Sequence, residues 1–299
     1  MRRMRRIACA AFIATAGAAL LSAAPPPRST SLQAAGCDVR DGRVLVPAGT
    51  VLLGEDGEGR PGRKVAVAAF WIDRHEVTNR QFAAFVAATG YRTAAEREGG
   101  SAIFVPPAGP VDLNNAASWW RYRKGADWRH PDGAGSSIEG REDWPVIHVD
   151  HEDAAAYARW ASAALPDEAQ WERAARDDQA ASRPPASWAY DDEGHPTANS
   201  WQGVFPVRDT GRDGYAGLAP VGCFKGNSFG LHDMVGNVWE WTSEQRGRSG
   251  LVKGGSYLCA MNYCANFRPA AFQAQELDLG TSHIGFRTIS AAGGSPARR

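Results

Sequence analysis

The residues best suited to chemistry lie in the segment GGSYLCAMNYCANFRPA, which places Cys259 and Cys264 five positions apart in a chain with 5 cysteines. Such residues point about 140° apart round a helix and to opposite faces of a strand, so the thiols converge only if the segment bends. A converged pair can close a small disulfide loop, or it can hold a soft ion such as copper(I). Zinc would need two further ligands, and no CxxC pair or neighbouring histidine supplies them. The disulfide and the copper(I) interpretations both stay open at this point.

Two loops rich in oxygen atoms are candidates for binding hard cations. In ANSWQGVFPVRDTGRDGYAG, Asn199 and Asp213 bracket a loop with many carbonyl groups, and in FGLHDMVGNVWEWTSE, Asp233 and Glu240 flank Gly236. Calcium prefers carboxylate, amide and backbone carbonyl oxygens on flexible loops, so both segments are compatible with calcium. For the first segment, an ordinary loop of Asx turns explains the same residues equally well.

A third cluster, His148, Asp150 and His151, has the residue types of a metal site, but it lies where a strand meets a predicted helix. Capping of that helix and contact with solvent explain these residues better than a metal does. We therefore predict no metal site at this junction.

The elements that must position these residues are short. Thr78 as an N-cap, apolar residues at helical spacing and Gly90 as a stop predict one helix. Asp150 with Asp153 predicts a second helix that runs to Pro166, and a third begins in LPDEAQWERAARD. The segment RVLVPAGTVLLG alternates as a strand and hairpin do. After the third helix, glycine, asparagine, aspartate and tryptophan dominate, so we expect an α+β fold with low regular secondary structure.

Composition limits the classes of function. Lys plus Arg and Asp plus Glu number 33 each over 299 residues, so no overall charge attracts nucleic acid or an anionic membrane. The start MRRMRRIACAAFIATAGAALLSAAPPP predicts a secretory signal peptide at 1–24. A linker at 25–43, a folded domain at 44–292 and a disordered tail at 293–299 follow. No later stretch is long enough to span a membrane, so we expect an exported protein, periplasmic or secreted.

Export also determines the environment of the other cysteines. Cys9 leaves with the signal peptide, while Cys37 and Cys223 share an oxidising compartment with the pair described above. These two cysteines can pair with each other, although connectivity does not follow from sequence alone.

Eight segments fall in the order seen in a known family, over about residues 44–289. They are VTNRQFAAFVAATGYRTAAERE, WWRYRKGADWRHPDG, PVIHVDHEDAAAYARWA, LPDEAQWERAAR, NSWQGVFPVRDTGRDGYAG, FGLHDMVGNVWEWTSE, KGGSYLCAMNYC and HIGFRT. In these segments the chain resembles the formylglycine-generating enzymes, also called sulfatase-modifying factors. The resemblance implies a single irregular α+β domain related to C-type-lectin-like folds, with structural calcium.

Enzymes of that family use O2 to convert a cysteine in a CxPxR segment of unfolded sulfatases to formylglycine, with copper(I) held between two cysteines. The resemblance implies that the two cysteines of the opening segment bind copper(I) and that Ser256 lies at the oxygen-activating site. Trp128, Tyr263 and Arg268 match family positions around the substrate groove. The implied partners are an unfolded sulfatase polypeptide and O2.

The resemblance also implies two structural calcium ions. Their ligands would be the side chains of Asn199 and Asp213 with the backbone of Ser200 and Tyr215 for the first, and the side chains of Asp233 and Glu240 with the backbone of Gly236 and Val238 for the second. Asp233 replaces the usual asparagine, which adds a negative charge that an oxygen-rich cation site tolerates.

Three positions depart from the family pattern. Ala260 stands where the family often has histidine, Phe272 where it has arginine, and His283 where an asparagine precedes LGFR. The last two border the expected groove. We therefore expect the cysteine chemistry to be retained and the peptide preference to differ.

Two alternatives come from other classes of function. Relatives without the cysteine pair act as noncatalytic binding partners, and retention of both cysteines weighs against that role here. Iron-dependent sulfoxide synthases share this domain but carry an additional N-terminal helical domain with a histidine iron triad, of which the sequence before Val44 shows no sign. A divergent member with a peptide-binding or other redox role is the remaining alternative.

Overall fold

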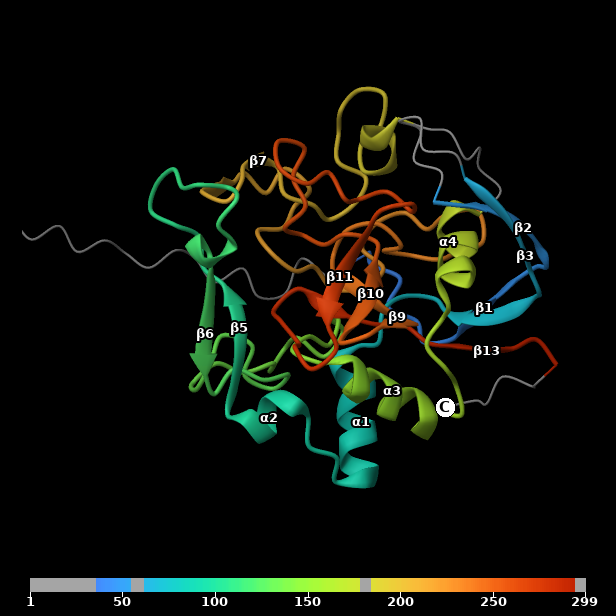
Figure 1. Ribbon diagram of the computed structural model, residues 1–299, viewed down its shortest axis with the longest axis horizontal. Helices are drawn as coiled ribbons and strands as arrows, with labels where there is room; N and C mark the ends of the chain where they lie inside the picture. Colours follow the sequence, from blue (N-terminus) through green and yellow to red (C-terminus); the bar gives the residue numbers. More distant parts are fainter. Residues whose placement is uncertain (1–35, 55–61, 178–183, 294–299) are drawn as a thin grey trace, which may run out of the picture.

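The computed structural model describes residues 36–54, 62–177 and 184–293 (Figure 1). Within these ranges, short helices and strands are joined by long irregular segments, which confirms the predicted α+β class with little regular secondary structure. The same ranges contain no helix that is long and apolar enough to cross a membrane. The predicted signal peptide at 1–24, most of the predicted linker and nearly all of the predicted tail lie outside the described residues.

Two sheets form the centre of the molecule. One has the strand order β1 (Arg43–Val46), β4 (Phe70–Asp73), β13 (Ile289–Ala291), and the other has the order β11 (Phe272–Glu276), β10 (Ser249–Lys253), β9 (Trp239–Arg246), β12 (Ile284–Gly285). All of these pairings are antiparallel except that of β12 with β9. Three two-stranded ribbons join β2 (Gly49–Leu53) to β3 (Arg63–Val67), β5 (Gly100–Phe104) to β6 (Trp120–Lys124), and β7 (Gly203–Val204) to β8 (Arg208–Asp209).

The hairpin predicted within residues 43–54 is wrong. β1 pairs with β4 and β2 pairs with β3, so the two strands of that segment belong to different sheets. Alternation of apolar residues identifies a strand and the face that it buries, but it does not identify the neighbouring strand.

The helices are α1 (Asn79–Thr89), α2 (Ala94–Glu98), α3 (His151–Trp160) and α4 (Glu168–Arg176), with short 3₁₀ segments η1 (Ala116–Ser118) and η2 (Pro185–Trp188). Thr78 and Asp150 cap α1 and α3 as predicted, and each forms a reciprocal capping box with the third residue of its helix. Gly90 ends α1 in the left-handed conformation, at φ 66°. The third predicted helix is α4, which Asp167 caps.

Helix α3 ends at Trp160, earlier than the predicted stop at Pro166. Ser162 adopts φ 51°, and the Ala163 N–H donates to the Ala158 carbonyl at 2.8 Å. This left-handed turn satisfies the last helical carbonyls before the proline is reached.

The cluster of His148, Asp150 and His151 supports the start of α3, as the capping interpretation predicted. His148 Nδ1 lies 2.9 Å from Ser101 Oγ, and His151 Nε2 lies 3.0 Å from the Thr242 carbonyl oxygen. The predicted contact with solvent is wrong, because all three side chains are buried and satisfy their polar atoms within the protein.

The four-stranded sheet has two chemically different faces. Its register places Trp241 beside Val252 on one face and Glu240 beside Lys253 on the other. The first face packs into the aromatic core that also contains residues of α1 and α3, which lie together in Figure 1. The second face is turned towards α4, where Glu172 accepts a hydrogen bond from Lys253 Nζ at 3.0 Å.

A buried ion pair joins the two sheets. Arg287 is 0% exposed and Glu240 is 1% exposed. The guanidinium Nε and Nη2 each donate to one carboxylate oxygen at 2.7 Å, and Trp171 Nε1 donates to the same carboxylate at 2.7 Å. The remaining guanidinium hydrogen bonds go to the backbone carbonyls of Asp73, Arg74 and His232.

A disulfide ties the start of the described chain to the body. Cys37 is bonded to Cys223, and the Asp38 N–H donates to the Gly222 carbonyl at 2.8 Å. Gly222 has φ 71°, and a Cβ there would lie 2.2 Å from the Asp38 carbonyl oxygen, so this approach requires glycine. The last residues of the segment predicted as linker are therefore attached to the folded body.

Replacement of Arg287 by methionine should lower the free energy of unfolding by about 3–5 kcal/mol, because it leaves the Glu240 carboxylate buried without its charge partner. Chemical denaturation monitored by tryptophan fluorescence measures the change. Arg159→Met is the matched control, since Arg159 pairs with Glu152 and both side chains are 63% exposed. Equal losses in the two variants would contradict a structural role for the buried pair.

Candidate active site

The cysteine segment folds back on itself directly after β10. Gly254 and Gly255 have φ 97° and 76°, and a Cβ on Gly255 would lie 2.9 Å from the Asn266 carbonyl oxygen. The backbone that enters the segment at Gly255 therefore lies against the backbone that leaves it at Asn266. The N–H groups of Tyr263 and Ala265 both donate to the Ala260 carbonyl, which closes the bend that returns the second cysteine to the first.

Cys259 and Cys264 meet in this bend as free thiols, the first buried and the second half-buried. A hydrogen bond from the Cys259 thiol lowers the pKa of Cys264 to about 7. The same hydrogen bond, together with burial, raises the pKa of Cys259 well above its usual value. The Ser256 N–H lies 3.4 Å from Cys259 Sγ. Cys264 is partly ionised to a thiolate at neutral pH, and two sulfurs in one site fit a soft monovalent ion. The structure contains the two cysteines as free thiols and not as a disulfide loop.

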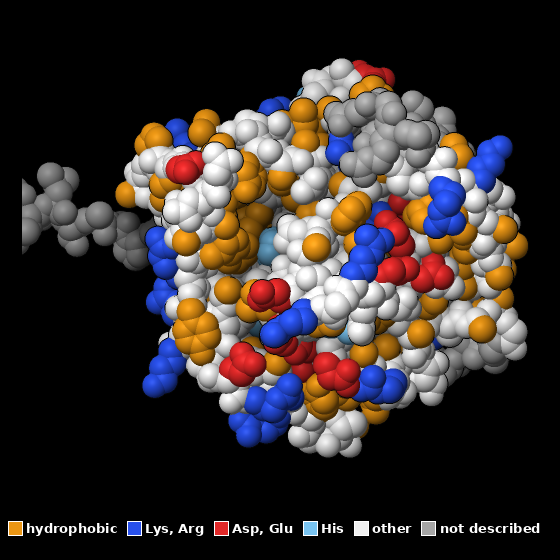
Figure 2. Space-filling model, in the orientation of Figure 1, with side chains coloured by type: hydrophobic (Ala, Val, Ile, Leu, Met, Phe, Trp, Pro, Cys, Tyr) orange, Lys and Arg blue, Asp and Glu red, His pale blue; other side chains and the backbone are white. Residues whose placement is uncertain are grey.

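Both cysteines line a cavity of about 480 Å³. One wall comes from Trp119 and from Trp120 of β6, and another comes from Gln273 and Gln275 of β11. Figure 2 shows a hollow edged by hydrophobic side chains between the β5–β6 ribbon and the four-stranded sheet. The remaining lining residues are Ala102, Ala116, Phe205, Trp239, Ser256, Leu258, Tyr263, Asn266, Leu279, Thr281 and His283.

Two of the predicted substrate residues, Tyr263 and His283, line this cavity. The Tyr263 ring stacks on Phe205 at 4.6 Å between centroids. The His283 ring lies 4.8 Å from Trp120, and its Nδ1 lies 2.6 Å from Thr281 Oγ1. These contacts fix the orientation of both rings before any ligand arrives.

The other three predicted substrate residues do not line the cavity. Trp128 is 2% exposed and packs in the core against Phe82, with ring centroids 5.2 Å apart. Phe272 lies on β11, where alternation points its side chain away from the cavity face that carries Gln273. Arg268 is half-buried, in the segment between the cysteines and β11.

The first predicted calcium cluster is assembled round Asp213. One carboxylate oxygen accepts the Ser200 N–H at 3.2 Å and Gln202 Nε2 at 2.7 Å, while the other accepts the Tyr215 N–H at 2.9 Å. Gln202 Nε2 also donates to the Ser200 carbonyl, so oxygens from two residues converge on one donor. Asn199 adjoins this group, and its amide donates to the Gly217 carbonyl at 2.9 Å. Converging oxygens of these kinds fit a hard cation.

The second predicted calcium cluster lies among buried carboxylates. Asp233 accepts the Gly222 N–H at 2.6 Å, and Glu240 carries the bond to Arg287. Glu76, which sequence reasoning missed, is 0% exposed, and its Oε2 has no hydrogen-bond partner among the described atoms. Burial, followed by the negative charge of Asp233, raises the pKa of Glu76 well above its usual value. A cation here would satisfy the orphaned oxygen and balance the excess acidity, so the donor set fits calcium.

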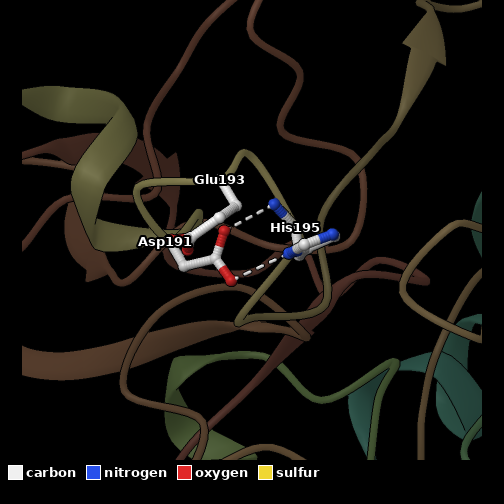
Figure 3. Close-up of side chains that lie close together, drawn as sticks. All are labelled: Asp191, Glu193 and His195. Carbon is white, nitrogen blue, oxygen red and sulfur yellow. Dashed lines mark hydrogen bonds and ion pairs between the residues drawn. The ribbon is translucent and has the colours of Figure 1, made fainter.

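A further group of potential ligands, Asp191, Glu193 and His195, lies on an exposed loop (Figure 3). Asp191 accepts the His195 N–H at 2.7 Å and lies 3.1 Å from His195 Nδ1. These two contacts close the loop, which accounts for the grouping without an ion.

Comparison with known proteins agrees with this geometry. The family described as sulfatase-modifying factor enzyme 1-like domain matches residues 30–292 of the chain. The chain belongs to the formylglycine-generating enzyme family. The match begins at residue 30, within the segment predicted as linker. The same segment contains Cys37, whose disulfide to Cys223 attaches it to the folded body.

Curated relatives from this family cover most of the chain. The formylglycine-generating enzyme of Thermomonospora curvata is 43% identical over 284 residues, which covers 84% of this chain and 93% of the relative. That of Mycobacterium tuberculosis is 42% identical over 294 residues, covering 83% and 97%. A Mus musculus relative named inactive C-alpha-formylglycine-generating enzyme 2 is 37% identical over 268 residues, covering 84% and 86%. Family membership therefore includes active and inactive proteins.

Among solved structures, PvdO from Pseudomonas aeruginosa has a TM-score of 0.61 at 22% identity, covering 85% of this chain and 96% of that chain. At this level of identity the likeness concerns the fold alone. It confirms the predicted single irregular domain of the formylglycine-generating enzyme type.

The free energy of unfolding should fall as pH drops from 6.5 towards 4, because two buried histidines resist protonation. Burial lowers the pKa of His148 to about 4 and that of His283 to about 3, against a usual value of 6.5. Between these values the unfolded chain binds more protons than the folded one, so stability is fully present above pH 6.5 and is lost below it.

His283→Asn should reduce the slope of this loss by about 1.4 kcal/mol per pH unit, the value for one proton. Denaturation curves at several pH values between 4 and 7 measure the slope. The wild-type protein, measured over the same pH range, is the reference for this slope. An unchanged slope in the His283 variant would show that this ring does not titrate as buried and neutral.

Proposed function

We propose that this protein is a formylglycine-generating enzyme that oxidises a cysteine within a CxPxR-type segment of an unfolded sulfatase, with O2 as oxidant and copper(I) as cofactor. The observation that supports the proposal most strongly is the free pair of Cys259 and Cys264 in one cavity, within a chain of this family. Ser256, which the resemblance assigns to oxygen activation, lies beside the pair, with its N–H 3.4 Å from Cys259 Sγ.

The residues of the chain suit a soft metal at the cysteine pair. The two sulfurs would hold copper(I), which when bound supplies electrons to O2. Cys264 needs little energy to lose its proton at neutral pH, because the Cys259 thiol donates to its sulfur. Trp119, Trp120 and Tyr263 give the cavity an aromatic wall beside the two sulfurs. A substrate thiol entering the cavity would meet both sulfurs of the pair.

Calcium is proposed as a structural cofactor at the two clusters described above. Asp213 anchors the first and Asp233 with Glu240 anchors the second, in segments with little regular secondary structure. Ligated cations would hold these loops in place of hydrogen-bonded ladders. The second cluster gains Glu76 as an additional donor.

Export to the periplasm or the exterior is proposed from the predicted signal peptide and the disulfide between Cys37 and Cys223. Disulfides persist in oxidising compartments. A peptide-binding role without catalysis is the second candidate, because a relative named inactive also covers most of this chain. The retained cysteine pair favours the enzyme over this alternative.

Reduced protein should bind about one copper(I) per chain, the expectation from two soft ligands in one site. Cys259→Ser and Cys264→Ser should each lose tight binding and turnover, because a neutral hydroxyl is a poor substitute for a thiolate. Competition with a copper(I) chelator measures binding, and hydrazide capture with mass spectrometry detects the aldehyde made from a CxPxR peptide in the presence of reductant.

Met261→Leu is the matched control for copper binding, since this thioether lies between the cysteines but is 53% exposed. It should keep the wild-type stoichiometry. Copper binding without aldehyde from any CxPxR peptide would reject the enzyme and leave the binding role.

Removal of calcium should lower the melting temperature, because an ion that binds only the folded state stabilises it by mass action. A site held at 100-fold above its dissociation constant contributes roughly 2.7 kcal/mol, which corresponds to a shift of roughly 5–10 °C in a domain of this size. Thermal unfolding with excess chelator measures the shift, and added calcium should restore it. Identical curves with and without chelator would contradict both sites.

A further inference from the structure

Beside the cavity, strand β11 has a free edge. It is the outermost strand of its sheet, so no strand of the described chain pairs with its other side. Such an edge presents unpaired N–H and C=O groups, which proteins usually protect with lysine, proline or a bulge. The sequence FQAQE has neither lysine nor proline, and it pairs with β10 in unbroken register.

The hydrogen-bond pattern identifies the groups on this edge. The Leu277 N–H donates to the carbonyl of the residue before β10, at 3.0 Å, in the same register. Because every second residue of an antiparallel strand bonds to one neighbour, Gln273 and Gln275 bond to β10. The N–H and C=O of Ala274 and Phe272 therefore point to the free edge. Both residues are exposed, Phe272 by 41%.

Along β11, the side chains alternate between the two faces of the sheet with the same period of two residues as the backbone hydrogen bonds. Gln273 and Gln275 line the cavity that contains the cysteine pair, and the residues between them face away. A polypeptide added to the free edge would place every second side chain over the cavity. The edge therefore aligns an extended segment with the site of reaction.

We propose that the substrate segment docks as an additional antiparallel strand on the free edge of β11, with its target cysteine opposite Gln273 or Gln275. This inference rests on the proposed function, because it takes an unfolded CxPxR segment as the occupant. Main-chain pairing suits such a substrate, since the bonds do not depend on side-chain identity.

The proline of CxPxR determines the direction of pairing. Proline has no N–H, so it cannot occupy a bonded position on the added strand. The target cysteine lies two residues before the proline. Because bonded and non-bonded positions alternate along a strand, the cysteine and the proline both occupy non-bonded positions. In antiparallel pairing, the non-bonded positions of the added strand lie opposite Gln273 and Gln275, and their side chains face the cavity. In parallel pairing, the residues whose side chains face the cavity would have to donate the hydrogen bonds, and proline cannot donate one. The pairing is therefore antiparallel.

The residue between cysteine and proline then lies opposite Ala274 and exchanges two hydrogen bonds with it. Its side chain points away from the cavity, so the position accepts different residues. A residue that precedes proline favours extended backbone, so the segment is already shaped for strand addition.

Alternate backbone amides of the substrate should therefore differ in importance. The probes are fluorescent peptides with serine in place of the target cysteine: one unmodified, one N-methylated at the serine, and one N-methylated at the next residue. Methylation at the next residue should raise the dissociation constant about tenfold, because it removes one bonded donor and crowds the edge. Methylation at the serine should change it less than about twofold, since that amide makes no bond to β11.

Ala274→Pro tests the same edge from the protein side. It removes an outward N–H, which edge strands tolerate, and should weaken binding of the unmodified peptide about tenfold. The melting temperature of the variant establishes that it is folded, and if it is not, the two methylated peptides decide alone. Equal constants for those peptides, wild-type binding by a folded Ala274→Pro, or no binding of the unmodified peptide would each overturn the docking mode. Aldehyde formation from the cysteine peptide by the wild type is measured separately, so failure of the proposed function is distinguished from failure of the docking mode.

Discussion

The buried guanidinium of Arg287 is the constraint on which the central structure depends. A charge that is removed from water is tolerated only when its hydrogen-bond donors are satisfied, and here the acceptors come from strand β9, from the end of strand β4 and from the loop that contains His232. Glu240 can meet this cation only if β12 and β9 lie side by side, which their parallel pairing provides. The ion pair thereby fixes the sheet that separates the charged layer under α4 from the aromatic layer round the cavity.

This separation explains the chemistry that remains on the cavity face. Cations and carboxylates gather on the opposite face, where Lys253 and Glu172 are bonded to each other. The cysteine pair is left among aromatic rings, neutral amides and one buried imidazole, and the largest cause of the lowered pKa of Cys264 is the hydrogen bond from its partner Cys259. A pair of sulfurs in such a cavity, where the one histidine of the described lining is buried and held by Thr281, suits a soft ion better than it suits thiol exchange at the surface.

Short sequence patterns predicted the helix caps, whereas the pairing of strands that are distant in sequence could not be predicted from such patterns. The caps at Thr78 and Asp150 follow from side chains within three residues, and the structure confirms both. The pairing of β1 with β4 depends on distant partners that no local pattern names. The same limit applies to the site: Glu76 lies far from Asp233 in sequence, and only the fold brings its unpaired carboxylate oxygen to the acidic cluster. Motif matching assigned Trp128 to the surroundings of the groove, and the fold shows that it is 2% exposed and packs in the same core cluster as Cys259.

The three departures from the family pattern are not equivalent once they are placed in the fold. Ala260 is 0% exposed and packs with Trp201, so a histidine there would have to displace the surrounding core. The side chain of Phe272 points away from the cavity, so the change at this position does not alter the side chains that line it. His283 alone presents a changed side chain to the cavity, and burial keeps its ring neutral. Among these three positions, the side chain that reaches the cavity is therefore one uncharged imidazole held by Thr281, and under the proposed function a difference in peptide preference should originate there.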